Sequence, residues 1–107
     1  MEKKMNTTID FEFCDRSTAK LTLTFYAIYQ LKSKNRSLYN RYNEAISNSQ
    51  KNSYDELEMA TILYAAYMCA NGDSEGCMSE EEFLMKLGSD RVSVANAVKE
   101  LINPKKQ

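Results

Sequence analysis

An uncharged stretch of twelve residues, 59–70, predicts a helix that the rest of the protein encloses. It reads MATILYAAYMCA, and its apolar side chains point in every direction around a helical period instead of along one stripe. The run is too short to cross a bilayer, which takes roughly 20 residues. Ser53 is a candidate N-cap, acidic residues follow it, and Gly72 stands just past the end. We therefore expect a central buried helix near residues 54–71.

The N-terminal part alternates apolar and polar positions with the period of a strand. The alternation runs from Thr7 to Cys14 and, after a polar break at residues 15–18, from Ala19 to Thr24. It predicts a two-stranded hairpin with one apolar face, which is marginal alone and should lie on helices. The residues expected to point inward are Ile9, Phe11, Phe13, Ala19, Leu21 and Leu23, and those expected to point outward are Asp10, Glu12, Lys20, Thr22 and Thr24.

Two helices are predicted between the hairpin and the central helix. The first runs from Phe25 to about Ser33 with Thr24 as its cap, and Asn35 marks its end. The second is capped by Ser37 and covers roughly residues 38–47, before a polar loop at residues 48–52. The side chains available for packing are Phe25, Ile28, Tyr29 and Leu31 in the first helix, and Leu38, Tyr39, Tyr42, Ala45 and Ile46 in the second.

The C-terminal third carries a complete helix start signal. Ser79 and Glu82 have the spacing of a capping box, and Met78 and Phe83 occupy the positions of a hydrophobic staple. A short helix should therefore begin at Glu80. It should end at Gly88, and Ser89 or Asp90 should cap a last helix, closed by Pro104, with the apolar stripe Val92, Ala95, Val98, Leu101 and Ile102.

These elements predict an α+β fold, an N-terminal hairpin packed on about five helices. With 107 residues, 43% hydrophobic and 27% charged, the sequence fits one soluble domain, 1–107, with residues 1–6 loose and 103–107 as a tail. No signal peptide or membrane anchor is expected. Three cysteines without a C-x-x-C pair indicate a reducing cytosol. Because the chain has no histidine, the usual nucleophile–base pairs are excluded, and we expect neither an enzyme nor a cofactor.

Charge is balanced overall but divided along the chain. Residues 20–51 are basic and residues 52–82 are acidic. Such a molecule suits head-to-tail association into a homo-oligomer, in which the basic surface of one copy meets the acidic surface of the next. Ordinary solvated helix faces are the other interpretation. The basic residues are Lys20, Lys32, Lys34, Arg36, Arg41 and Lys51 against the single acid Glu44, and the acids are Asp55, Glu56, Glu58, Asp73, Glu75, Glu80, Glu81 and Glu82 against no base.

Residues 71–82 resemble the twelve-residue calcium loop of an EF-hand. Asp73, Gly76 and the closing Glu82 fit the template, whereas Asn71 opens it instead of aspartate and Glu75 is long for the fifth position. Helix capping explains Ser79 and Glu82 equally well. We expect no metal site, and keep as the alternative function a single calcium-binding module with Asn71, Asp73, Glu75 and Glu82 as ligands.

Two segments have features of nucleic acid readers. Residues 83–102 read as helix, turn and helix, but the three glutamates at 80–82 would repel phosphates, so an ordinary helical hairpin is favoured. Residues 32–42 are basic with tyrosines between, yet Tyr39 and Tyr42 fit a packing stripe. We expect no nucleic acid partner and no membrane partner. The polar residues concerned are Arg91, Ser93, Asn96 and Lys99 in the first segment and Lys32, Lys34, Arg36 and Arg41 in the second.

From about Thr8 onward the chain resembles the small tail assembly chaperones of long-tailed bacteriophages and prophages. The likeness lies in IDFEFCDRSTAKLTLTFYAIYQLK, TILYAAYMCAN and MSEEEFLMKLGSDR. It implies a non-enzymatic helper in the cytoplasm of an infected or lysogenic bacterium that binds the tape measure protein and recruits tail tube subunits. It transfers no site residues. It also implies a longer frameshifted form, for which the codons of Lys105 and Lys106 are a candidate slippage site.

Overall fold

The computed structural model describes residues 8–50, 55–71 and 77–102. It has a two-stranded antiparallel hairpin followed by five helices, so the predicted α+β fold is confirmed. The elements are β1 (Ile9–Glu12), β2 (Thr18–Leu21), α1 (Phe25–Lys34), α2 (Arg36–Gln50), α3 (Glu56–Asn71), α4 (Glu80–Leu87) and α5 (Arg91–Ile102).

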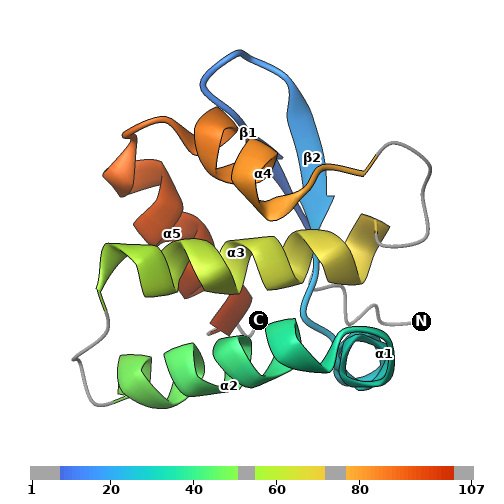
Figure 1. Cartoon of the computed structure of the whole chain (residues 1–107). Coiled ribbons are helices and arrows are strands. Elements are labelled where there is room, and N and C mark those ends of the chain that lie inside the picture. Colours follow the sequence, from blue (N-terminus) through green and yellow to red (C-terminus); the bar gives the residue numbers. More distant parts are fainter. Residues whose placement is uncertain (1–7, 51–54, 72–76, 103–107) are drawn as a thin grey trace, which may run out of the picture.

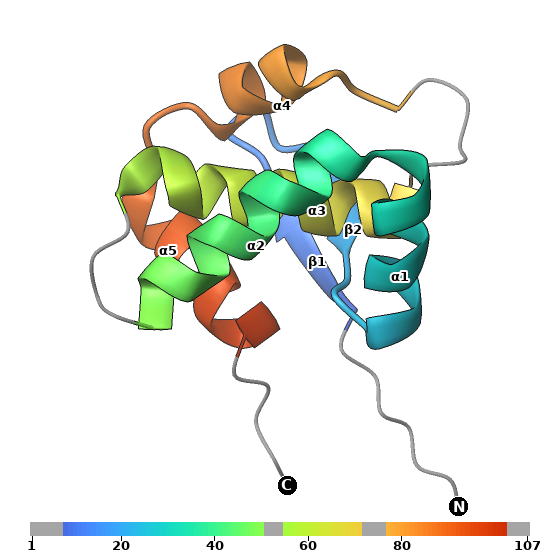
Figure 2. The ribbon, with the colours of Figure 1, turned by 60° about the horizontal axis from the view of Figure 1, so that its bottom comes forward.

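Helix α3 crosses the middle of the molecule (Figure 1). It contacts α1, α2, α4, α5 and β2, and β1 contacts α5. Helices α1 and α2 lie on one side of α3, and the hairpin and α4 lie on the other (Figure 1). Figure 2, turned by 60°, shows α2 running across α3, with α1 beside the start of α2. The core therefore surrounds one helix.

The buried face of α3 extends around its whole circumference, as its sequence predicts. Seven of its residues are buried, six of them consecutive, and Ile62 and Leu63 are 0% exposed. Burying a side chain of this size contributes about 1.5–3 kcal/mol, so this helix dominates the stability of the core. Asp55 caps it, because its carboxylate accepts from the Glu58 N–H and the Glu58 carboxylate accepts from the Asp55 N–H. Ser53 and Gly72, the ends proposed from the sequence, lie outside the described residues.

The two strands of the predicted hairpin pair antiparallel, with Ile9 opposite Leu21 and Glu12 opposite Thr18. The apolar positions point inward or are half-buried, and their polar neighbours are exposed, with one exception. The prediction that Thr22 points outward is wrong, since only 8% of it is exposed. Strand β2 ends at Leu21, and the Thr22 N–H donates to the Ala66 carbonyl of α3 at 3.2 Å. The alternation stops there because the backbone turns onto α3.

Helix α1 begins after Thr24, whose hydroxyl accepts from the Ala27 N–H, as predicted. Two of its expected packing residues, Phe25 and Tyr29, are instead exposed. Leu31 is its buried residue, and Tyr29 lies two positions before it, about 200° away around the helix. The inward face of α1 is thus narrower than its apolar sequence indicates.

Helix α2 is longer than predicted at both ends. It begins at Arg36, and the cap is Asn35 rather than Ser37, because the Asn35 side chain accepts from the Leu38 N–H at 3.2 Å. It continues to Gln50, so the loop expected from residue 48 begins later. The remaining polar residues of that loop, 51 and 52, lie outside the described residues. Its predicted stripe is confirmed in Leu38, Tyr42 and Ala45, which are buried, and in Tyr39 and Ile46, which pack against the core.

Helix α4 begins with the predicted capping box of Ser79 and Glu82, and both hydrogen bonds of the box are present. Phe83 in its first turns is 0% exposed, and Met78 packs against the same core. The helix ends at Gly88, which has a φ of 63°. This left-handed backbone favours glycine.

Helix α5 is capped by Asp90, whose carboxylate accepts from the Ser93 N–H at 3.1 Å. The prediction that Val92 packs inward is wrong, because 71% of it is exposed. The buried face follows the i, i+3, i+4, i+7 pattern from Val94, and Val92 lies about 200° from that residue. Pro104, the predicted end signal, lies outside the described residues, as do residues 1–6 and 103–107. The buried residues of α5 are Val94, Ala97, Val98 and Leu101.

Within the described residues, no helix combines the length and apolar character needed to span a membrane.

Candidate protein-binding surfaces

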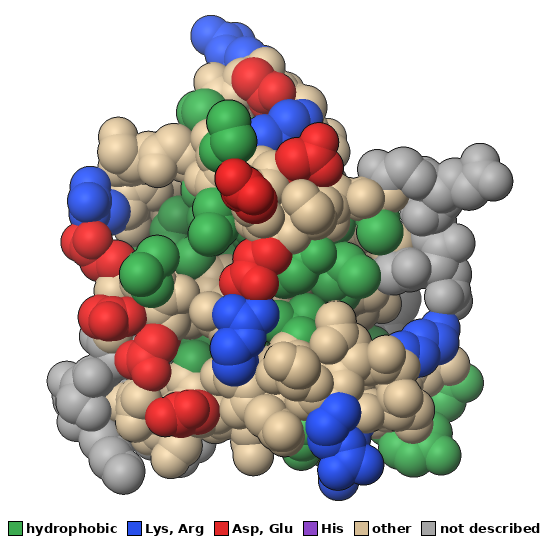
Figure 3. All heavy atoms as spheres, viewed as in Figure 1, with side chains coloured by type: hydrophobic (Ala, Val, Ile, Leu, Met, Phe, Trp, Pro, Cys, Tyr) green, Lys and Arg blue, Asp and Glu red, His purple; other side chains and the backbone are tan. Residues whose placement is uncertain are grey.

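An apolar groove lies where α3, α4 and α5 meet. It encloses a cavity of about 210 Å³. Leu57 of α3 lines it with 68% of its surface exposed, and the exposed hydrophobic residues Met85 and Val92 lie next in sequence to the lining residues Leu84 and Arg91. Figure 3 shows hydrophobic side chains gathered between α3 and α4 on this face. The groove is lined by Glu56, Leu57, Met59, Ala60, Leu84, Leu87, Gly88, Ser89, Asp90, Arg91 and Val94.

The charged residues around the apolar groove are mainly acidic. Asp55, Glu56 and Asp90 stand against Arg91. The Arg91 guanidinium donates to the Glu56 carboxylate at 2.5 Å, so this ion pair joins α5 to α3 beside the groove. Glu81 is exposed and lies one turn before Met85 on α4. A ligand in this groove would therefore meet an apolar floor and a negative rim.

A second apolar surface covers the outer side of α1. Phe25, Tyr26 and Tyr29 have 66–91% of their surface exposed, and we call these three residues the aromatic face. The Tyr26 and Tyr29 rings stack with centroids 6.3 Å apart. Lys32 lies one turn beyond Tyr29, and its ammonium group is 5.4 Å from the centre of the Tyr39 ring. The aromatic face is thus flanked by positive charge.

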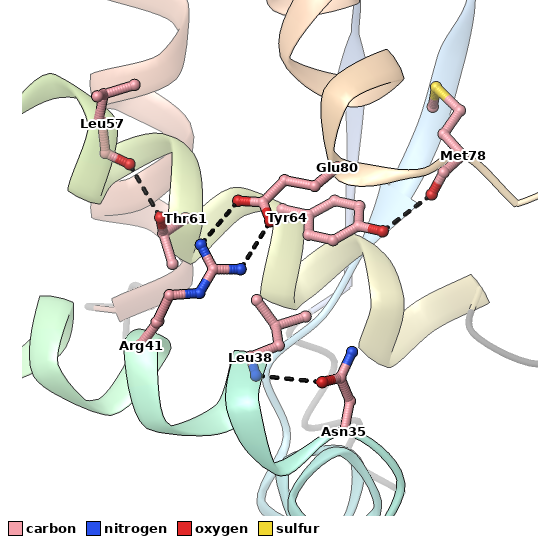
Figure 4. A network of polar contacts seen from close by, with 8 residues as sticks. All are labelled: Asn35, Leu38, Arg41, Leu57, Thr61, Tyr64, Met78 and Glu80. Atoms are coloured by element: carbon pink, nitrogen blue, oxygen red, sulfur yellow. Dashed lines mark hydrogen bonds and ion pairs between the residues drawn. The ribbon is translucent and has the colours of Figure 1, made fainter.

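Helix α4, which forms one wall of the groove, is held to α2 and α3 by polar contacts (Figure 4). The Arg41 guanidinium donates two hydrogen bonds to the Glu80 carboxylate, at 2.6 and 3.0 Å. The Tyr64 hydroxyl donates to the Met78 carbonyl at 3.0 Å, and the Tyr67 hydroxyl accepts from the Met78 N–H at 2.8 Å. These contacts fix the start of α4, and so they position the groove-lining residues Leu84 and Leu87.

The basic segment considered for nucleic acid binding is occupied by internal contacts. Arg41 pairs with Glu80, and the Tyr42 ring is buried, which raises the pKa of its hydroxyl to about 12. Burial is the main cause, because it disfavours the phenolate. In the helical hairpin of α4 and α5, Arg91 pairs with Glu56 and the Ser93 hydroxyl donates to Asp90. Arg41, Tyr42, Arg91 and Ser93 thus serve ion pairing, packing and capping.

Two of the four candidate calcium ligands, Asn71 and Glu82, lie in the described part of the chain. Asp73 and Glu75 lie outside the described residues. The Asn71 side chain donates to the carbonyls of Lys20 and Tyr67, both at 3.0 Å, and the Glu82 carboxylate accepts from the Ser79 N–H. Both described candidates therefore hold structural hydrogen bonds. Among the described residues, no group of three acidic or cysteine side chains is arranged to hold a metal ion.

The three thiols are free, with Cys14 exposed and Cys69 and Cys77 half-buried. Burial raises the pKa of Cys69 to about 11, which keeps this thiol protonated near neutral pH. It therefore behaves as a small apolar group packed against the core.

Comparisons with known proteins found no relative of this chain. No family model, no curated protein and no solved structure matches it. The two apolar surfaces are therefore identified from their geometry. Sequence reasoning missed them, because it assigned Phe25, Tyr29 and Val92 to the core and gave no role to Leu57 or Met85. One signal in the sequence could have indicated these surfaces: the helices contain more apolar residues than one buried helix face can accommodate.

Proposed function

We propose that this protein is a non-enzymatic tail assembly chaperone of a long-tailed bacteriophage or prophage. It binds the tape measure protein, keeps it soluble and recruits tail tube subunits in the cytoplasm of the bacterial host. The resemblance of the segments around residues 9–32, 61–71 and 78–91 to such chaperones supports this assignment. The structural observation that carries it is the apolar groove between α3, α4 and α5.

The apolar groove suits one helical segment of a long client. An amphipathic helix binds such a groove through apolar side chains spaced at i, i+3, i+4 and i+7. Met59 contributes a flexible thioether side chain, which adapts to clients of varied sequence. An exposed apolar surface bordered by charged residues is typical of a protein-binding site. A client helix with basic residues beside its apolar stripe would match the acidic rim.

The absence of histidine from the sequence supports a non-enzymatic role. The titratable groups with shifted pKa values in the described residues have structural causes. Hydrogen bonds from Ser93 lower the pKa of Asp90, and the ion pair with Glu56 raises that of Arg91. Both residues lie at the rim of the groove, where capping and ion pairing account for their shifts.

The experiment is co-expression with a client. The reading frames near this gene are searched for a very long helical protein, and a fragment of it is expressed with or without the chain. We expect the chain to keep the fragment soluble and to elute with it in gel filtration. The variant Leu57→Asp, which changes an exposed side chain that lines the groove, should lose this effect, whereas Lys99→Ala on the exposed side of α5 should retain it.

Aggregation of the fragment with the wild-type chain present, and no complex in gel filtration, would contradict the proposal. Retained activity of Leu57→Asp would instead show that the groove is not the client site. Both variants are checked by circular dichroism, so that loss of folding is not mistaken for loss of binding.

A further inference from the structure

Two surfaces of this chain complement each other in shape and in charge. The apolar groove is concave with an acidic rim, and the aromatic face of α1 is an exposed helix surface with basic residues at one end. We propose that the aromatic face of one copy docks into the apolar groove of a second copy, with the Phe25 side chain as the anchor.

The groove has room for the proposed anchor. Its cavity of about 210 Å³ exceeds the roughly 150 Å³ of an apolar protein cavity that holds benzene. Phe25 has 91% of its surface exposed, the largest fraction among the exposed large hydrophobic residues of the described chain. Aromatic side chains that fill pockets are frequent anchors of interfaces. Tyr26 and Tyr29 would then cover the rim around the ring.

The charges favour this pairing over the symmetric ones. Among the residues that line the groove, Glu56 and Asp90 against Arg91 leave a formal charge of −1, and Asp55 of the adjoining surface adds one more acid. The end of α1 and the start of α2 carry Lys32, Lys34 and Arg36, a formal charge of +3. Contact between two copies of α1, or between two grooves, would set like charges together. Docking of α1 into the groove brings opposite charges together.

Such a contact is heterologous, because each copy offers one aromatic face and one groove. Association therefore continues beyond two copies unless the series closes into a ring. One face of a ten-residue helix is a small contact beside the roughly 800 Å² that each partner buries in a stable interface. The contact is accordingly reversible and depends on concentration. If the proposed chaperone function is correct, a client helix and a second copy compete for the same groove.

The test uses the protein alone, with no client present. Sedimentation velocity is measured from about 10 µM to about 1 mM, the range in which weak interfaces associate. The average mass of the wild-type chain should rise with concentration, and should rise less at high salt, which screens the charges. A wild-type chain that stays monomeric throughout would overturn the proposed contact, while leaving client binding to its own experiment.

Two variants then identify the surfaces. Phe25→Ala removes the anchor and keeps the groove, and Leu57→Asp changes the groove and keeps the anchor. Each variant alone should associate at least about tenfold more weakly than the wild type. An equal mixture retains one intact contact and should form a dimer that grows no further. Since both side chains are exposed, folding should be unaffected, and circular dichroism checks this.

Lys99→Ala, which changes an exposed residue of α5, should associate like the wild type. Variants that associate as strongly as the wild type, or a mixture that stays monomeric, would overturn the proposal.

Discussion

The Tyr67 hydroxyl accepts a hydrogen bond from the backbone N–H of Met78 at 2.8 Å, where the chain approaches α4. The Tyr64 hydroxyl donates to the carbonyl of the same residue at 3.0 Å. Both tyrosine rings pack against Phe83, with ring centroids 5.3 Å apart in each case. Two neighbouring side chains of the central helix thus satisfy both backbone groups of Met78 and position the wall of the apolar groove.

We predict that Tyr67→Phe destabilises the protein by about 1–3 kcal/mol. The change keeps the ring but leaves the Met78 N–H without its partner in a partly buried place. The free energy of unfolding is measured by urea denaturation. Tyr26→Phe is the matched control, because its hydroxyl is on an exposed ring, and it should change stability by less than about 0.5 kcal/mol. Equal effects of the two changes would contradict this role of Tyr67.

Gly88→Ala is predicted to be destabilising by at least about 1–2 kcal/mol. The φ of 63° is strained for a residue with a Cβ atom, and that atom would lie 3.1 Å from the Cys14 sulfur. Thermal unfolding measures the loss. The double variant Cys14→Ala/Gly88→Ala should regain only the part caused by the close contact. Full recovery in the double variant would show that backbone strain contributes nothing.

Asp15 should stabilise the folded protein near neutral pH, and this contribution should be lost in acid. Two hydrogen bonds from Ser17 lower the pKa of its carboxyl from 3.8 to about 2. Because the folded pKa is lower than the unfolded one, this contribution is complete above about pH 4 and is lost as the pH falls toward 2. Urea midpoints of Asp15→Asn should therefore be lower than those of the wild type at pH 6 and should converge with them near pH 2.

The Asp15 carboxyl can also be titrated directly by NMR. Ser17→Ala removes the hydroxyl donor and should raise the pKa of Asp15 toward 3.8. An Asp15 pKa near 3.8 in the wild-type chain would contradict the account of this turn.

The sequence contains enough local information to predict most of the elements. The uncharged run of α3 has no polar side to expose, and Ser79 with Glu82 marks the start of α4 by hydrogen bonds three residues apart. These features depend on neighbours in the chain, so they can be read without the fold. The cap of α2 was missed because Asn35 ends α1 and begins α2 with different groups, a double use that no single-helix rule anticipates.

The periodic pattern of apolar residues could not predict the candidate surfaces. An apolar stripe shows which residues are able to face a core, but the neighbouring helices decide how wide a face they cover. Val92 and Val94 are equally apolar, but Val94 is buried and 71% of Val92 is exposed. The groove also joins residues that lie far apart in the sequence, such as Leu57 and Asp90. The division of charge between basic and acidic segments was visible from the start, but its relation to these two surfaces required their positions.

The most direct test of the proposed chaperone function is an NMR footprint of a client on the folded chain. A soluble amphipathic helical peptide, taken from the very long helical protein for which the neighbouring reading frames are searched, is titrated into the ¹⁵N-labelled protein at low protein concentration. We predict amide shifts centred on the groove-lining residues Leu57, Leu84 and Val94, with little change at Lys99. No shifts at peptide concentrations up to about 1 mM, the weak limit of specific binding, would contradict client binding, and shifts confined to other surfaces would contradict the groove as its site.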